Sequence, residues 1–102
     1  MISMFYGYDW TQGMELHQIR YFLETAETLN FTRASEHCNV SQPALTRAIK
    51  KLEDELGGLL FRRERNQTHL TDLGKVMKQY LSRVDSSTRE ATLAAQQVLN
   101  LE

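Results

Sequence analysis

Two short amphipathic helical segments separated by only a few residues constrain this 102-residue chain more than any other feature. The first is predicted over about 31–38, and Asn30 is placed to cap it because an asparagine side chain accepts from an unpaired backbone N–H. The second begins at Ser41-Gln42-Pro43, where serine caps well and proline in the first turn removes an N–H that has no helical partner. It is expected to end near Leu56, because Gly57-Gly58 can adopt the left-handed backbone that ends helices.

The connection between these two helices is typical of a helix-turn-helix pair. Asn39 stands where the chain must reverse, and asparagine tolerates left-handed backbone angles better than most residues. Ser35 is small at a position of close approach. Cys38, the only cysteine, is interpreted as a core residue, with a reactive thiol as the less favoured alternative. The residues expected to pack the pair together are Ala34, Cys38, Val40, Leu45, Ala48 and Ile49.

Periodicity also predicts the elements on either side of the pair. Apolar residues at three- and four-residue steps predict a first helix over about 15–29, with a buried face of Leu16, Ile19, Phe22, Leu23, Ala26 and Leu29. Segments 59–61 and 68–70 flank a polar tip, Arg62 to Gln67, and predict a small β-hairpin. Thr71-Asp72 then caps a long final helix to about Leu99. The expected fold class is mainly α: three helices and a small hairpin, followed by a long helix.

Residues 1–13 differ from the rest of the chain. They contain four aromatic residues, no basic residue and no helical or strand period. We expect a flexible extension or one foreign to the native protein, the alternative being an aromatic arm that packs on the domain or a partner. The predicted organisation is this extension (1–13), a domain over 14–71 and a long helix for dimerisation over 72–102.

The final helix carries apolar and small residues at alternating steps of four and three, which is a heptad seam. The first three helices offer too little surface to cover it beyond its first turns. We therefore favour pairing of two chains over packing of this helix within one domain. The distal part of the seam should pair weakly, because its residues are small. The seam consists of Leu73, Met77, Tyr80, Val84, Ser87, Ala91, Ala94, Val98 and Leu101.

The distribution of charge points to a different partner from the total charge. The chain has a formal net charge of −1, which as a bulk number argues against a nucleic-acid binder. However, residues 33–51 carry a net +3 and residues 59–71 a net +2. Residues 41–51 include three basic residues and no acidic one. The acidic residues Glu53, Asp54 and Glu55 stand at the C-terminal end of that helix, where the helix dipole disfavours negative charge. The basic half is expected to face phosphate, unless it is simply a solvated face.

Other function classes lack the residues that they need. His17, His37 and His69 fall in three different elements, so we expect no metal site. The sequence has no glycine-rich phosphate loop, nucleophile elbow or catalytic Cys–His arrangement, so neither an enzyme nor a cofactor is expected. Its longest apolar run is three residues, so no membrane partner is expected. The rival from another class is a helical protein-interaction or dimerisation module without specific DNA binding.

Several strings resemble the LysR-type transcriptional regulators. They are N-F-T-R-A-S-E at 30–36, V-S-Q-P-A-L-T-R at 40–47 and I-K-K-L-E at 49–53, and they agree with the family in order and spacing. L-F-R-R at 60–63 and L-T-D-L-G at 70–74 resemble that family's wing and the start of its linker helix. The resemblance implies a bacterial, cytoplasmic and nucleoid-associated protein. It would be a winged helix-turn-helix that binds double-stranded operator DNA as a homodimer, usually within a tetramer.

The resemblance also implies roles for individual residues. Base-contacting positions fall on Gln42, Pro43, Thr46 and Arg47, with Lys50 suited to either role. Phosphate-contacting positions fall on Thr32, Arg33, Ser41 and Lys51. The wing lacks the family's glycine near its tip and carries Glu64 as a repulsive element; its contacts fall on Arg62, Arg63, Arg65, Asn66 and Gln67. A small-molecule effector would act only through a domain absent here, so a fragment or a naturally short relative is expected.

Overall fold

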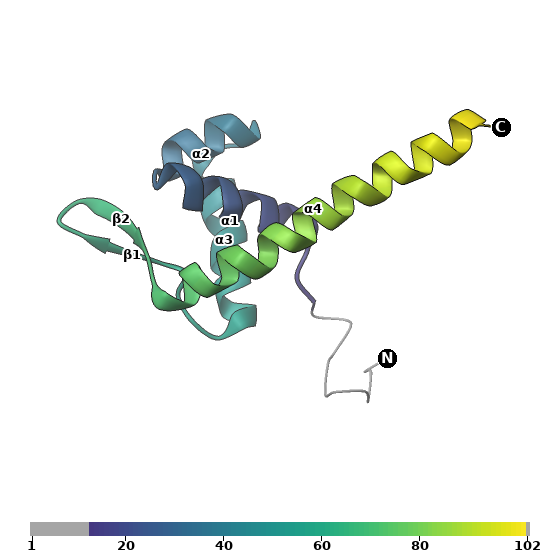
Figure 1. Ribbon diagram of the computed structural model, residues 1–102. Coiled ribbons are helices and arrows are strands. Elements are labelled where there is room, and N and C mark those ends of the chain that lie inside the picture. The colour runs from purple at the N-terminus through teal and green to yellow at the C-terminus, as the bar shows by residue number, and fades with distance from the viewer. Residues whose placement is uncertain (1–12, 102) are drawn as a thin grey trace.

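The computed structural model describes residues 13–101, which form a mainly helical fold (Figure 1). Three helices come first: α1 (Leu16–Thr28), α2 (Phe31–Cys38) and α3 (Gln42–Leu56). An antiparallel hairpin of β1 (Phe61–Glu64) and β2 (Gln67–Leu70) leads to α4 (Asp72–Leu101). The predicted fold class is therefore confirmed. The extension expected over 1–13 lies, apart from Gly13, outside the described residues.

Side-chain caps set the boundaries of α2 and α3 as predicted. The Asn30 side chain accepts a hydrogen bond from the backbone N–H of Arg33 at 2.9 Å, and the Ser41 hydroxyl accepts from that of Ala44 at 3.2 Å. Asn39 and Gly57 end the two helices in the left-handed conformation, with φ of 63° and 84°. Each cap acts within a few residues, which is why local sequence specifies it.

One hydrophobic core joins the helices to the hairpin. Phe22, Leu45 and Leu52 are fully buried between α1 and α3. The Phe61 ring lies 5.6 Å from that of Phe22 and 5.4 Å from that of Phe31, between ring centroids, and so anchors β1 in the same core. Packing of the helix pair is confirmed as well, because the residues buried there include Ala34, Ser35, Cys38, Leu45 and Ile49.

The predicted buried face of α1 is only partly right. Ile19, Phe22 and Ala26 are buried, but Leu16 and Leu29 are 55% and 43% exposed. Polar side chains, those of Gln18 and Thr25, are buried in their place at 1% and 0% exposure. The reason is that α1 packs against α2, α3 and α4, so its buried face is set by three neighbours rather than by its apolar residues alone. Leu29 has itself left the helix, with φ of 51°.

The hairpin has longer strands and a shorter tip than predicted. Its ladder runs from Phe61 opposite Leu70 to Glu64 opposite Gln67. The tip is therefore Arg65-Asn66 alone, and both residues have positive φ, 52° and 61°. Such a two-residue turn matches the twist of the strands, and asparagine suits it better than arginine does. Leu59, expected in the first strand, precedes it and is 63% exposed.

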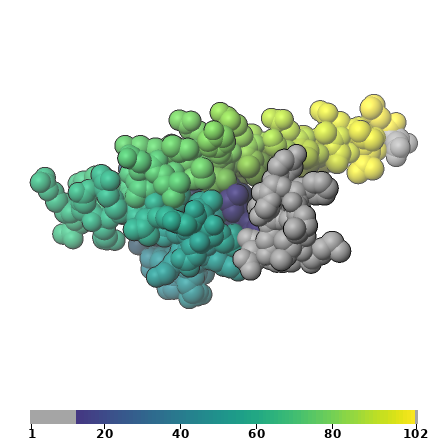
Figure 2. Space-filling view, turned by 90° about the horizontal axis from the view of Figure 1, so that it is seen from below, coloured from purple at the N-terminus to yellow at the C-terminus, as the bar shows by residue number. Residues whose placement is uncertain are grey.

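The 30-residue helix α4 has a covered part and an uncovered part. Leu81 is buried, and Leu73 and Met77 pack half-buried against the core. Beyond them α4 projects away from the body formed by the other elements (Figures 1 and 2). Every residue from 86 to 101 is exposed. Within residues 13–101, no helical segment combines the length and the hydrophobicity that a membrane span requires.

Candidate nucleic-acid interface

The outer face of α3 presents most of the residues predicted to contact bases. Leu45, Ile49 and Leu52 turn inward, so the helical period places the basic side chains on the opposite side. Thr46 lies half-buried at the edge of that face. The exposed residues are Gln42, Pro43, Arg47, Lys50 and Lys51.

Two of these side chains are already joined to each other. The Gln42 amide nitrogen donates a hydrogen bond to the Thr46 hydroxyl at 2.8 Å, one helical turn away. Gln42 can therefore still accept through its amide oxygen, and Thr46 can still donate its hydroxyl proton. Ser41, predicted to contact phosphate, uses its hydroxyl to cap α3 and is exposed just before the helix.

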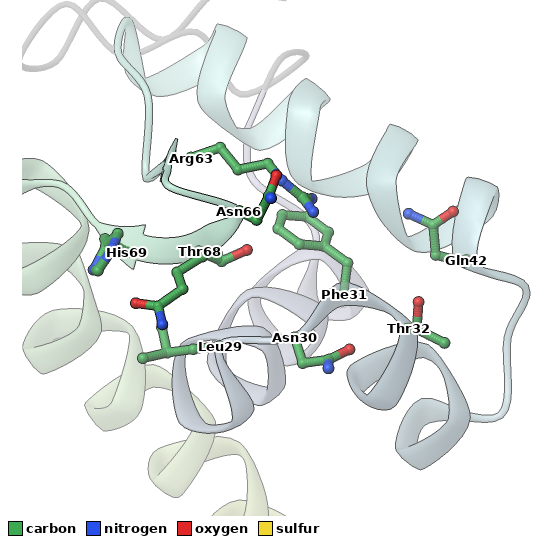
Figure 3. Close-up of a pocket in the computed structure, with 10 residues that line it drawn as sticks. Leu29, Asn30, Phe31, Thr32, Gln42, Arg63, Asn66, Thr68 and His69 are labelled. Atoms are coloured by element: carbon green, nitrogen blue, oxygen red, sulfur yellow. The ribbon is translucent and has the colours of Figure 1, made fainter.

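A groove separates α3 and the start of α2 from the hairpin. It consists of two adjoining hollows of about 470 and 310 Å³, and Phe31, Gln42, Arg63 and Thr68 line both of them. Figure 3 shows Thr32 and Gln42 on the helical side of the larger hollow, and Arg63 and Asn66 on the hairpin side. Thr46 and Lys50 from α3 line the smaller hollow together with Arg62. The structure thus brings residues from three predicted groups to one groove.

Of the remaining predicted residues, Gln67 alone lines one of the two hollows, and the others line neither: Arg33, Ser41, Pro43, Arg47, Lys51 and Arg65. Arg33 is exposed in the first turn of α2, beside Thr32. Gln67 lines the larger hollow, while Arg65 is exposed at the tip of the hairpin. Arg62 is paired with Glu64, Nε to Oε1, at 2.6 Å. Glu64 therefore offsets the charge of one wing arginine within the wing, and in the described part of the chain no such pair involves Arg63 or Arg65.

Glu53 is a residue whose role sequence reasoning missed. Its carboxylate oxygen Oε2 accepts hydrogen bonds from the backbone N–H groups of Leu60 at 2.7 Å and Phe61 at 3.4 Å. This use explains why an acid stands at the end of α3, where the helix dipole disfavours it. That misplacement was the only sign in the sequence, and the acids beside it, Asp54 and Glu55, are simply exposed.

The predicted seam on α4 divides between two environments. Leu73 and Met77 at its beginning pack on the core of the same chain, as does Leu81, which the seam did not include. The other seam residues form an exposed stripe, which Val76 extends at 47% exposure. The stripe, called here the α4 stripe, consists of Val76, Tyr80, Val84, Ser87, Ala91, Ala94, Val98 and Leu101.

The three histidines are not gathered into a metal site. Within residues 13–101 no group of three or more His, Cys, Asp or Glu side chains could hold a metal ion. His37 instead contacts the Glu24 carboxylate at 2.5 Å, joining α2 to α1. His17 lies 3.3 Å from the Glu15 carboxylate, and His69 lines the larger hollow.

Comparison with known sequences gives a consistent family. Residues 16–75 match the model of the bacterial regulatory helix-turn-helix protein, lysR family. The chain is 55% identical over 62 residues to the HTH-type transcriptional regulator CatR of Pseudomonas putida, covering 61% of this chain and 21% of that protein. It is 40% identical over 85 residues to the uncharacterized regulator YwqM of Bacillus subtilis, covering 83% and 29%. The chain thus spans less than a third of either relative.

Solved structures of similar fold include both isolated domains and a full-length regulator. The BenM DNA-binding domain in complex with the catB site 1 DNA has a TM-score of 0.79 and 32% identity, covering 83% of this chain and 96% of that one. A full-length OxyR from Pseudomonas aeruginosa has a TM-score of 0.80 and 38% identity, covering 83% and 29%. The CbnR DNA-binding domain in complex with DNA has a TM-score of 0.77 and 29% identity, covering 83% and 98%.

The matched segment contains α1, the first turn of α4, and the helix pair and hairpin that line the groove. The family is one of transcriptional regulators, not of enzymes. The chain belongs to the LysR family of bacterial helix-turn-helix regulatory proteins, of which it represents the winged helix-turn-helix domain and the helix that follows.

Proposed function

We propose that this chain binds double-stranded DNA in a sequence-specific manner, with α3 in the major groove and the wing (residues 59–71) at the adjacent backbone and minor groove. The observation that carries the proposal is the groove itself. Residues 41–51 carry three basic side chains and no acidic one. Gln42 and Lys50 of α3 line the same groove as Arg62 and Arg63 of the wing. The major groove admits a helix of this width.

The residues divide between reading bases and binding the backbone. The residues assigned to bases lie on the part of α3 that would enter the DNA major groove deepest: Gln42, Pro43, Thr46, Arg47 and Lys50. Glutamine and arginine side chains match the edges of adenine and guanine. The phosphate backbone of the DNA would be contacted on both sides of the helix. The residues assigned to phosphates are Thr32, Arg33, Ser41 and Lys51.

The wing extends this footprint along the duplex. Arg63 and Arg65 supply its net positive charge, because Glu64 pairs with Arg62. Arginine side chains suit a narrow minor groove, where the negative potential is strong. Asn66 at the tip and Gln67 at the start of β2 add neutral hydrogen-bonding groups. The BenM and CbnR structures of similar fold are themselves complexes with DNA.

The active species is a homodimer joined through α4, with residues 14–71 as the DNA-binding domain and 72–102 as the linker helix. Support comes from the α4 stripe, in which Tyr80, Val84 and Val98 are 54%, 39% and 60% exposed. A partner helix would remove this surface from water. The chain spans 21% of CatR. In a full-length parent, the family resemblance implies an added effector-sensing domain and assembly as a tetramer.

A duplex titration at two salt concentrations tests DNA binding. Random 30-base-pair duplexes are first enriched by selection on the chain, and the affinities of the enriched and starting pools are then compared. Groove binding requires the enriched pool to bind more tightly, with affinity that falls as salt rises by a slope of roughly −0.9 per neutralised phosphate. If no duplex is enriched, or if the affinity for duplex does not depend on salt concentration, an interaction module without specific DNA binding is favoured.

A further inference from the structure

A carboxylate on α3 holds the segment at which the wing begins. Glu53 lies on the side of α3 that faces the wing, and it lines the smaller hollow together with Lys50, Leu59 and Arg62. Its two hydrogen bonds reach the backbone at the junction between the helix cap and β1. A single half-buried side chain therefore joins the helix to the first strand of the hairpin.

The other side of this junction is bound to Thr71, which precedes α4 and caps its first turn. The Leu60 carbonyl accepts from the backbone N–H of Thr71 at 3.0 Å, and the Thr71 hydroxyl donates to the Leu59 carbonyl at 2.5 Å. Gly74 permits the close approach, since a Cβ there would lie 2.3 Å from the Leu60 carbonyl oxygen. The fully buried Leu60 is thus held between α3 and α4, with Glu53 as its connection to α3.

We propose that Glu53 is a positioning residue for DNA binding, one that fixes the wing relative to α3 so that both reach the duplex together. This inference rests on the function proposed above. A two-stranded hairpin is only marginally stable by itself, so its orientation depends on what anchors its base. A single side-chain oxygen accepts from two successive backbone N–H groups and so holds the start of β1 at two points, which makes Glu53 an effective anchor. Without these hydrogen bonds, a carboxylate so near the groove between α3 and the wing would only repel DNA phosphates.

Three single variants separate positioning from charge. Glu53→Ala removes both the acceptor and the charge, Glu53→Gln keeps an acceptor oxygen, and Glu55→Ala removes the same charge from an exposed site on the same helix. On the enriched duplex, we expect Glu53→Ala to bind about tenfold more weakly. The slope of log affinity against log salt should become less negative by roughly 0.9, which corresponds to the loss of one neutralised phosphate. Glu53→Gln should remain near the wild type, and Glu55→Ala should bind equally or more tightly.

A double-mutant comparison shows whether Glu53 acts through the wing. In a background carrying Arg62→Ala and Arg63→Ala, the wing has no net charge, so Glu53→Ala should cause little further loss of affinity. An undiminished loss in that background would overturn the proposal. Glu53→Gln binding as weakly as Glu53→Ala would do the same, because the acceptor oxygen would then be irrelevant.

Hydrogen exchange of the DNA-free chain provides a readout that does not depend on the proposed function. Glu53→Ala should speed exchange of the Leu60 and Phe61 amides, and Glu53→Gln should keep them protected. Unchanged exchange in Glu53→Ala would refute the anchor, whereas a wild-type chain that fails to bind duplex would refute DNA binding alone. If Glu53→Ala does not fold, Glu53→Asp replaces it, because its carboxylate is one methylene too short to reach both N–H groups.

Discussion

The body of the molecule and the distal half of α4 are both helical, but they bury their apolar side chains differently. In the body, the side chains of Phe22, Leu45 and Leu52 are covered by other elements of the same chain. In α4, burial stops at Leu81, which is 2% exposed, while Val84 one turn further on is 39% exposed. The chain thus contains a domain that covers its own apolar core, followed by a helix whose apolar side chains are not covered by the rest of the described chain.

This difference assigns the two regions different sources of stability. Burial of apolar surface drives folding of the body without a partner. An isolated helix is marginal in water, so the distal half of α4 needs tertiary or quaternary packing to be well formed. Substitutions in the body should therefore change stability or DNA binding, and substitutions in the α4 stripe should change association.

The largest expected effect breaks the body. Phe22→Ala should lower the free energy of unfolding by about 3–5 kcal/mol, because it removes a fully buried ring. Leu16→Ala, at a site 55% exposed, should change it by less than about 0.5 kcal/mol. Urea unfolding measures both, and equal losses would contradict the assignment of the core.

Cys38 provides a second measurement for the same pair of variants. Burial raises the pKa of its thiol, so little thiolate is present near neutral pH and the buried sulfur should be alkylated slowly. Alkylation should become much faster in Phe22→Ala, because opening of the body exposes the thiol. It should stay slow in Leu16→Ala.

The next effect separates the two regions. Val84→Asp should weaken dimerisation by about 3 kcal/mol or more, because it places an uncompensated charge in a buried seam. Leu93→Asp is the matched control, since Leu93 is also exposed on α4 but lies nine residues further on, on the opposite side of the helix. Sedimentation should show monomers for the first variant and dimers for the second. A dimer in both would place the interface elsewhere.

Substitutions on α3 should change DNA binding without changing association. Arg47→Ala should cost about 1–3 kcal/mol on the enriched duplex and much less on random duplex, because it removes a base contact. Lys51→Ala should weaken both alike, as expected of a phosphate contact. Titrations with the two pools measure this difference. Equal losses for Arg47→Ala on both pools would show that Arg47 does not read bases.

The smallest effect tests a local contact. Asn30→Ala should destabilise the body by about 1 kcal/mol, because the backbone N–H of Arg33 loses its cap. Asn30→Asp keeps the acceptor and should be close to the wild type. Thermal unfolding measures the pair, and a loss in both variants would mean that Asn30 acts otherwise than through its cap.

Much of the fold and of the candidate interface could be predicted from sequence because their determinants are local. Asn30, Ser41 and Gly57 act on backbone groups within a few residues, and α2 and α3 begin and end where these residues predict. The basic outer face of α3 follows from the helical period once its buried side is known. The predicted hairpin tip, Arg62 to Gln67, is too long because Arg65-Asn66 is not a strong turn sequence, and only the ladder shows where the strands end.

What the sequence determined by itself is therefore the set of elements, their caps and the side of α3 that carries charge. Only the tertiary structure decided which faces meet: that Gln18 and Thr25 are buried while Leu16 is exposed, and that Glu53 anchors the wing through Leu60. It also decided where α4 leaves the body, just beyond Leu81. The physical reason is range, since caps and periods act within one or two turns, whereas burial depends on neighbours far away in the sequence.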